Sequence, residues 1–184
     1  MQVSPKTKKA KVEDSRPVAG RPRNPETQKE ILKAAGEILL AEGYRALTME
    51  RLASRAGVGK TTVYRRWKCM ADLVSDLLDA ANSAWPMPQV KSENITEDLR
   101  TLYRNWISGM SGGGRIIPVL IAESVQNAEL ASLLHQRFIL PRRRLAIAMI
   151  DRAKDRGEVS KSVDSPSAID MFMGRMWYRQ LATG

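Results

Sequence analysis

A seven-residue segment that begins at Lys60 gathers hydroxyl groups and cations in a pattern that suits contact with nucleic acid. Its polar members are Lys60, Thr61, Thr62, Tyr64, Arg65 and Arg66. On a helix, hydroxyls and cations near the N-terminal end can reach base edges and phosphates in the major groove of DNA. Val63 and Trp67 lie four residues apart, so they can face a core while the polar side chains face outward. The alternative is a surface helix with ordinary charges.

The elements before this segment complete the outline of a helix-turn-helix. Thr48 is placed to cap a short helix whose buried stripe includes Leu52 and Ala53. Gly57-Val58-Gly59 interrupts that helix, and a third helix is expected at once over residues 60–67. Two short helices joined by a three-residue, glycine-bearing turn are typical of this DNA-binding motif.

Amphipathic helices are expected on both sides of the motif. Before it, Asn24 is a good N-cap, Pro25 suits a first helical position, and Gly43 suits a C-cap. Apolar residues at helical spacing between them predict a helix over residues 25–42. After the motif, a helix over residues 71–84 is expected to join it to the rest of the chain.

The C-terminal part also shows helical patterns and no sustained strand alternation, which predicts an all-α fold. The remaining helices are expected over residues 96–109, 115–125, 129–156 and 165–181. Thr96 and Ser165 are expected to cap the first and the last of these helices, and Pro141 to bend the longest. Residues 111–114, a serine followed by three glycines, predict a flexible break.

Positive charge is concentrated at the N-terminal end. The chain carries 30 Lys and Arg against 20 Asp and Glu, a net charge of +10. Residues 1–70 hold 16 basic and seven acidic side chains, whereas residues 71–184 hold 14 and 13. This asymmetry favours a polyanionic partner at one end of the molecule, and the alternative is a solubilising tail.

Residues 1–23 are expected to form a disordered basic arm, because they hold seven cations, three prolines and few large apolar side chains. Within them, Gly20-Arg21-Pro22-Arg23 has the core of a minor-groove hook. Arginine can enter a narrow A·T groove, and proline keeps the strip extended. Arg21 and Arg23 are therefore candidate DNA contacts, against the alternative of a purely solvated tail.

Other kinds of chemistry find little support in the sequence. Cys69 is the only cysteine, which excludes an intramolecular disulfide and fits a reducing compartment. His135 is the only histidine, which argues against the usual His/Cys metal sites. No acid–base pair or activated nucleophile indicates an enzyme. We therefore expect no cofactor, no metal and no membrane partner, since apolar runs such as residues 116–122 are too short to span a bilayer.

Residues 25–78 resemble the DNA-binding domain of the tetracycline-repressor (TetR) family. The matching words are Ile31-Leu32-Lys33-Ala34-Ala35, Glu42-Gly43-Tyr44, Leu47-Thr48-Met49, Leu52-Ala53, Ala56-Gly57-Val58 and Thr62-Val63-Tyr64-Arg65. The resemblance implies an all-helical, homodimeric bacterial repressor that a small ligand releases from a palindromic operator in double-stranded DNA. It therefore also implies a cytoplasmic protein that associates with the nucleoid.

The resemblance implies roles for individual side chains as well. Thr48 and Tyr64 would contact phosphates, Lys60, Thr61 and Thr62 would approach bases, and Arg65 and Arg66 would do either. The chain departs from the family pattern at Lys68-Cys69-Met70, where family members often have Pro-Ser-Lys. Cys69 is a poor N-cap and Met70 carries no charge for a phosphate, so Lys68 is the candidate replacement contact.

A ligand cavity is expected among the helices of residues 96–181. The candidate lining residues are Trp106, His135, Phe138, Met171, Phe172, Met173, Met176 and Trp177. Aromatic and methionine side chains at helical spacing are also typical of plain core packing, and His135 has the alternative of a structural histidine. Arg142, Arg143 and Arg144 are expected to form a solvated face.

Three parts are thus predicted: a basic arm over residues 1–23, a helix-turn-helix domain over 24–70, and a helical ligand-binding and dimerisation domain over 71–184. TetR-family dimers usually form by pairing of the last two long helices of each chain. The helix expected to end at about Leu181 matches the first of these two, and too few residues follow for the second, so a weak dimer is expected.

The expected function is a sequence-specific transcriptional regulator, a repressor released by a small molecule. The alternative is an architectural A·T-tract DNA-binding protein without a ligand.

Overall fold

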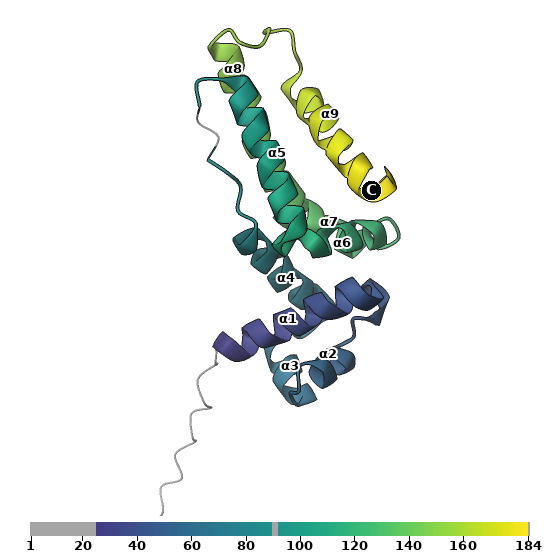
Figure 1. Ribbon diagram of the computed structural model, residues 1–184. Helices are drawn as coiled ribbons and strands as arrows, with labels where there is room; N and C mark the ends of the chain where they lie inside the picture. Colours follow the sequence, from purple (N-terminus) through teal and green to yellow (C-terminus); the bar gives the residue numbers. More distant parts are fainter. Residues whose placement is uncertain (1–24, 90–91, 184) are drawn as a thin grey trace, which may run out of the picture.

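The computed structural model describes residues 25–89 and 92–183, and every regular element in this part of the chain is helical (Figure 1). The elements are α1 (Pro25–Glu42), the 3-10 turn η1 (Tyr44–Ala46), α2 (Met49–Arg55), α3 (Lys60–Arg66), α4 (Met70–Ala84), α5 (Ile95–Ser111), the 3-10 turn η2 (Gly113–Ile116), α6 (Ile117–Ser124), α7 (Ala128–Leu134), the π-helical turn η3 (His135–Ile139), α8 (Leu140–Asp155), α9 (Ser165–Tyr178) and the π-helical turn η4 (Arg179–Thr183). The all-α prediction is confirmed. No helix in the described ranges is long and apolar enough to cross a bilayer.

Helices α1, α2 and α3 form the N-terminal region, at the lower end of Figure 1. The side chains of Ile31, Leu52 and Val63 meet in its core and are fully buried, which explains why one helix face is apolar in each case. Gly43 follows α1 with φ of +83°, and Gly57 lies in the turn after α2 with φ of +64°. Both values are in the left-handed region that glycine adopts without a Cβ clash, as the predicted C-cap and turn require.

Helix α4 belongs to two regions at once. Its buried residues Leu73, Val74, Leu77 and Leu78 join one continuous apolar core that runs from Ile31 of α1 to Phe138 of η3. A second, separate cluster lies at the far end of the C-terminal region and includes Leu102, Met149 and Ile169. The main core therefore does not stop at the end of the helix-turn-helix.

The C-terminal region is built around α5 and α8, which lie side by side in Figure 1 and are in contact. Helix α9 packs on α8, and the short helices α6 and α7 pair with each other between this group and α4. Contacts of α4 with α7 and η3, and of α1 with η2, hold the two regions together.

Two predicted N-caps are wrong by one or two residues. Helix α5 begins after Asn94, whose Oδ1 accepts the N–H groups of Thr96 at 2.9 Å and Glu97 at 3.2 Å, so Thr96 is inside the helix. Helix α9 is capped by Asp164, which accepts the N–H of Ser167 at 2.9 Å. Ser165 is instead buried, with its hydroxyl on Asp151 at 2.5 Å. In each case an Asx side chain shortly before the predicted cap serves the orphan N–H groups better.

The glycine-rich stretch predicted to be a flexible break instead packs closely against the end of α4, through Gly113 and Gly114. A Cβ on Gly114 would lie 2.4 Å from the Trp85 ring, and one on Gly113 would lie 2.4 Å from the Cβ of Ala84. Gly109, one turn earlier, would place a Cβ 2.0 Å from the Trp85 ring. These glycines let α5 and η2 approach the end of α4 more closely than any other residue would allow.

The predicted bend near Pro141 takes the form of the π-helical turn η3, which lies just before it. Proline has no N–H, so Pro141 cannot donate to the carbonyl of Arg137 four residues earlier. The side chain of Asn82 on α4 donates to that carbonyl oxygen at 3.0 Å. The carbonyl oxygen that Pro141 leaves without a helical donor is thus hydrogen-bonded to α4.

Candidate nucleic-acid interface and central cavity

Thr48 sets the position of α2 relative to α3. Its Oγ1 accepts the N–H of Arg51 at 3.2 Å, so it is the N-cap that the sequence predicts. Two ion pairs then fasten α2 to α1: Arg55 with Glu37 at 3.0 Å, and Arg51 with Glu42. These arginines are neutralised within the domain, which leaves the positive charge of α3 as its outward feature.

Helix α3 divides into a buried and an exposed face. Val63 and Trp67 are buried, as predicted, whereas the polar side chains of Lys60, Thr61 and Arg65 are exposed. Within residues 25–89 and 92–183, neither Lys60 nor Arg65 forms an ion pair. The exposed face therefore presents two cations outside ion pairs beside a hydroxyl, the chemistry that phosphates and base edges accept. The charge of Lys60 also contributes to lowering the pKa of Glu50.

Tyr64 is 45% exposed on the same helix and donates its hydroxyl to the Glu50 carboxylate of α2 at 3.0 Å. This bond raises the pKa of Tyr64. The pKa of Glu50 is lowered, first by a backbone N–H and then by the Tyr64 hydroxyl. Sequence reasoning missed Glu50, because its partner is on the next helix. A phosphate contact by Tyr64 would have to compete with this carboxylate.

Arg66 does not belong to the exposed face on which the sequence placed it. It is half-buried, and its Nη1 donates to Gln28 of α1 at 3.3 Å. Gln28 and the Trp67 indole both donate to Asp76 of α4 at 2.9 Å. The end of α3 therefore turns Arg66 toward α1 and α4, where it helps to orient α3. Thr62, at the middle of the helix, is also partly covered.

The junction between α3 and α4 departs from the family pattern in the way the sequence indicates. Cys69 is the N-cap residue of α4 but makes no side-chain cap bond. The Asp72 carboxylate, one turn into α4, accepts the backbone N–H of Lys68 at 2.9 Å instead. The Lys68 side chain is exposed at this junction. Arg21 and Arg23, the predicted minor-groove contacts, lie outside the described residues.

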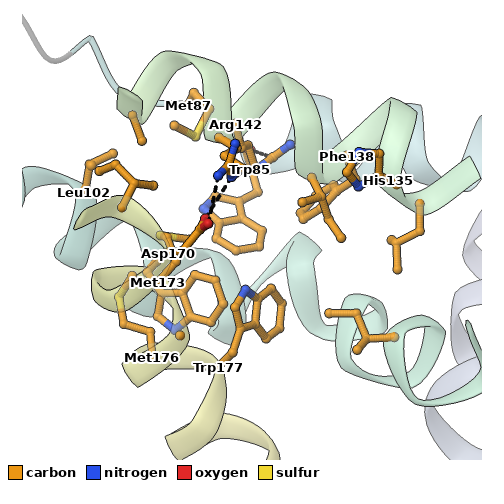
Figure 2. Close-up of a pocket in the computed structure, with 18 of the residues that line it drawn as sticks. Trp85, Met87, Leu102, His135, Phe138, Arg142, Asp170, Met173, Met176 and Trp177 are labelled. Carbon is orange, nitrogen blue, oxygen red and sulfur yellow. Dashed lines mark hydrogen bonds and ion pairs between the residues drawn. The ribbon is translucent and has the colours of Figure 1, made fainter. Parts of the chain in front are cut away.

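A cavity of about 630 Å³ lies in the C-terminal region between the end of α4, α5, α7, η3, α8 and α9 (Figure 2). The structure places six of the predicted residues around it: Trp106, His135, Phe138, Met173, Met176 and Trp177. Phe172 is not among the lining residues and contributes to a second groove between α5 and α9, and Met171 is exposed. The sequence did not identify Trp85 or Arg142, which also line the cavity.

Aromatic rings form a connected wall on one side of this cavity. Trp85 lies edge-on to Trp106 with ring centroids 5.5 Å apart, and Trp106 lies edge-on to Trp177 at 4.2 Å. Phe138 is 5.6 Å from Trp85. The Trp85 indole N–H is held by Asn105, with 2.9 Å to both its carbonyl and its side-chain oxygen. Such edge-to-face packing fixes the rings in place.

The three consecutive arginines of α8 do not form one solvated face. Arg144 is exposed, but Arg143 makes a two-pronged ion pair with Asp170 of α9, with both N–O distances 2.8 Å. Arg142 points into the cavity, with its guanidinium carbon 3.8 Å from the Phe138 ring centroid and 5.1 Å from that of Trp85. Successive helical positions point about 100° apart, so neighbouring arginines reach different environments.

Arg142 also touches α4 directly. Its Nη2 donates to the backbone carbonyl of Trp85, and its Nη1 to the side-chain oxygen of Asn82. Burial lowers the pKa of Arg142 to about 10, so the guanidinium is still protonated at neutral pH. Further links between the regions are the ion pair of Arg137 with Asp79 at 3.0 Å, and the contact of Arg45 on η1 with Glu123 of α6 at 3.5 Å.

Comparison with known proteins gives a consistent answer over both regions. Residues 31–77 match the family model described as bacterial regulatory proteins, tetR family, and residues 91–184 match the one described as tetracyclin repressor-like, C-terminal domain. The chain is 34% identical over 167 residues to the uncharacterized HTH-type transcriptional regulator YdeS of Bacillus subtilis, covering 90% of this chain and 83% of that protein.

Two further relatives extend the comparison. The DNA-binding transcriptional repressor TetR of Mycobacteroides abscessus is 25% identical over 150 residues, covering 81% of this chain and 79% of that protein. Among solved structures, the TetR family transcription regulator SCO0332 aligns with a TM-score of 0.60 and 32% identity, over 85% of this chain and 87% of that one. The agreement in sequence thus extends to the fold.

Proposed function

Because the chain belongs to the TetR family of DNA-binding transcriptional regulators, we propose that it is a repressor which a small molecule releases from its operator. One observation carries this proposal. Helix α4 is packed into the core of the helix-turn-helix at its start, and at its end it reaches Trp85 in the cavity wall. A compound in the cavity therefore acts on the element that positions the DNA-binding motif.

On the DNA side, we propose that α3 enters the major groove. Lys60, Thr61 and Thr62 approach bases, and Thr48, Tyr64, Arg65 and Lys68 contact phosphates or bases nearby. Lys60 and Arg65 support this assignment, because both are exposed and neither forms an ion pair within the described residues. Arg66 has the weaker case, because it is directed at Gln28. Arg21 and Arg23 would add minor-groove contacts from the arm.

We also propose that the protein acts as a homodimer on a palindromic operator, within the bacterial cytoplasm. A single helix-turn-helix makes few base contacts, and two-fold symmetry doubles them. The exposed apolar side chains of Leu145, Met171 and Leu181, on α8, α9 and η4, offer surface for such pairing. Sedimentation over a concentration series tests this, and a strict monomer both free and on DNA would contradict it.

The DNA-binding assignment is tested by fluorescence anisotropy on an operator selected from a random DNA pool. Tyr64→Ala and Thr62→Ala should each weaken specific binding by about 1–3 kcal/mol, the scale of a single recognition contact. Tyr103→Ala is the matched control, because Tyr103 is a similarly exposed tyrosine on α5. Unchanged affinity in both α3 variants would overturn the assignment.

Release is tested with the same assay in the presence of candidate ligands. A 100-fold loss of DNA affinity requires that the ligand prefer the DNA-free state by about 2.7 kcal/mol. A compound that fills the cavity and leaves DNA affinity unchanged would contradict the coupling through α4.

A further inference from the structure

The cavity combines apolar aromatic walls with one partly buried cation that forms no ion pair with an acid of the described residues. Its lining acid is Asp170, and this carboxylate is already paired with Arg143. Within the described residues Arg142 forms no ion pair, and its partners are a carbonyl and an amide oxygen, both neutral. A protonated guanidinium in apolar surroundings without a counter-charge favours an anion beside it.

The hydrogen bonds of Arg142 also leave a place for such an anion. Nη1 and Nη2 are used on Asn82 and Trp85, but Nε is buried with no hydrogen-bond partner in the described part of the chain. A buried donor without an acceptor costs free energy that a ligand oxygen could recover. Carboxylates commonly bind arginine through two parallel N–H groups, and Nε with a neighbouring Nη offers that arrangement.

The remaining walls specify the shape of the ligand. Trp85 and Trp177 each pack edge-to-face with Trp106, and the Arg142 guanidinium lies over the Phe138 ring. Trp85, Trp177 and Phe138 are labelled among the lining residues in Figure 2. Flat apolar surfaces of this kind bury a planar aromatic skeleton well. A volume of about 630 Å³ is in the usual range for a drug-sized compound, so two or three fused rings are of suitable size.

We propose that the cavity binds a planar aromatic acid whose single anionic oxygen group sits on the Arg142 guanidinium. The proposal rests on the proposed function, because it names the chemical class of the releasing ligand. It also gives the anion a role in release. The same guanidinium holds the end of α4 through Trp85 and Asn82, so an anion on Arg142 competes with α4 for its N–H groups.

The test is calorimetric titration of the full chain with three compounds that share one ring system: naphthalene-2-carboxylate, its neutral amide and the cationic 2-(aminomethyl)naphthalene. The carboxylate should bind at least tenfold more tightly than the amide, and the cation more weakly still. In Arg142→Gln the preference for the carboxylate should fall to within twofold. Arg144→Gln, which changes the exposed neighbour, should keep the full preference.

Equal binding of carboxylate and amide by the unmodified protein overturns the proposal, as does no binding of the carboxylate at millimolar concentration. A preference that survives in Arg142→Gln overturns it as well. The comparison of compounds on the unmodified chain does not depend on whether the variant folds, which circular dichroism checks. DNA anisotropy separates the two proposals: release by the neutral amide as well as by the carboxylate keeps the proposed function and rejects the acid. Selective carboxylate binding without any change in DNA affinity supports the acid and rejects release.

Discussion

Trp67 in the helix-turn-helix and Trp85 beside the C-terminal cavity are both buried, but the surroundings of the two rings differ. Trp67 is 2% exposed, and its indole donates to Asp76 nine residues later, in a core that is filled by α1, α3 and α4. Trp85 is 4% exposed and donates to Asn105 twenty residues later, beside a cavity of about 630 Å³. The ring of Trp67 lies in a core of helices that are close together in the sequence, whereas the C-terminal region surrounds a cavity.

The two regions also differ in where their cationic side chains lie. On α3, Lys60 and Arg65 hold their charges at the surface, where a polyanion can approach from solvent. On α8, Arg142 is partly buried and holds its charge against the Phe138 and Trp85 rings of the cavity wall. The exposed cations of α3 suit a large polyanion such as DNA, and the cation in the cavity suits a small, flat ligand.

The largest expected change in the free energy of unfolding tests whether the two regions unfold together or independently. Trp67→Ala and Trp85→Ala should each lower the free energy of unfolding by about 3–5 kcal/mol, the usual cost of removing a large core aromatic. Because α4 makes one continuous core of the two regions, we expect a single transition in urea, followed by circular dichroism and by near-ultraviolet signals. Two transitions, with Trp85→Ala affecting one alone, would show that the regions fold independently.

A smaller effect tests the close packing around Trp85. Gly109→Ala places a Cβ within 2.0 Å of the Trp85 ring, and such overpacking should cost about 1–3 kcal/mol. Gly174→Ala is the matched control, since Gly174 is also inside a helix and has nothing within 4 Å of its Cβ position. It should gain up to about 1 kcal/mol from helix propensity. Thermal unfolding of both variants measures the difference, and equal shifts would refute the packing argument.

The outward charge can be weakened by removing the arm. Deletion of residues 1–23 takes away seven cations, and for each phosphate that the arm neutralises, the plot of log affinity against log salt should become shallower by about 0.9. Cavity binding of naphthalene-2-carboxylate should be unaffected, because the cavity lies in the other region. Anisotropy at four salt concentrations measures the slope. An unchanged slope would mean that the arm does not touch DNA.

The smallest expected effect concerns Glu50, the acid that is hydrogen-bonded to Tyr64. Its lowered pKa keeps it ionised at neutral pH, so it repels phosphates that approach α3. Glu50→Gln should strengthen DNA binding by a few fold, because it removes an exposed negative charge beside α3. The same substitution in a Tyr64→Phe background separates the charge from the hydrogen bond. Weaker binding in Glu50→Gln would show that the carboxylate positions Tyr64 for DNA.

Local sequence predicted those elements whose caps, turns and apolar spacing are set by residues close together in the chain. The cap at Thr48, the glycine turn at Gly57 and the apolar spacing of Val63 and Trp67 all correspond to contacts that the structure shows. The same reasoning misplaced the caps of α5 and α9, because Asn94 and Asp164 lie just outside the apolar pattern that marked each helix. It also assigned Arg66 to the surface, since its partner Gln28 is 38 residues away.

Local patterns were therefore enough to predict the helical class, the helix-turn-helix and most of the outward face of α3, because a helix period and its caps are local properties of the chain. Contacts between distant segments were needed to show that Gly113 and Gly114 pack against the end of α4, and that Arg142 lies between Phe138 and the end of α4. Arg142 is 57 residues from Trp85 in the chain, and its neighbours Arg143 and Arg144 are chemically identical to it. Which arginine contacts Phe138, which pairs with Asp170 and which is exposed depends on the rotation of α8 against α4 and α9. That rotation is set by packing between elements that the local pattern does not describe.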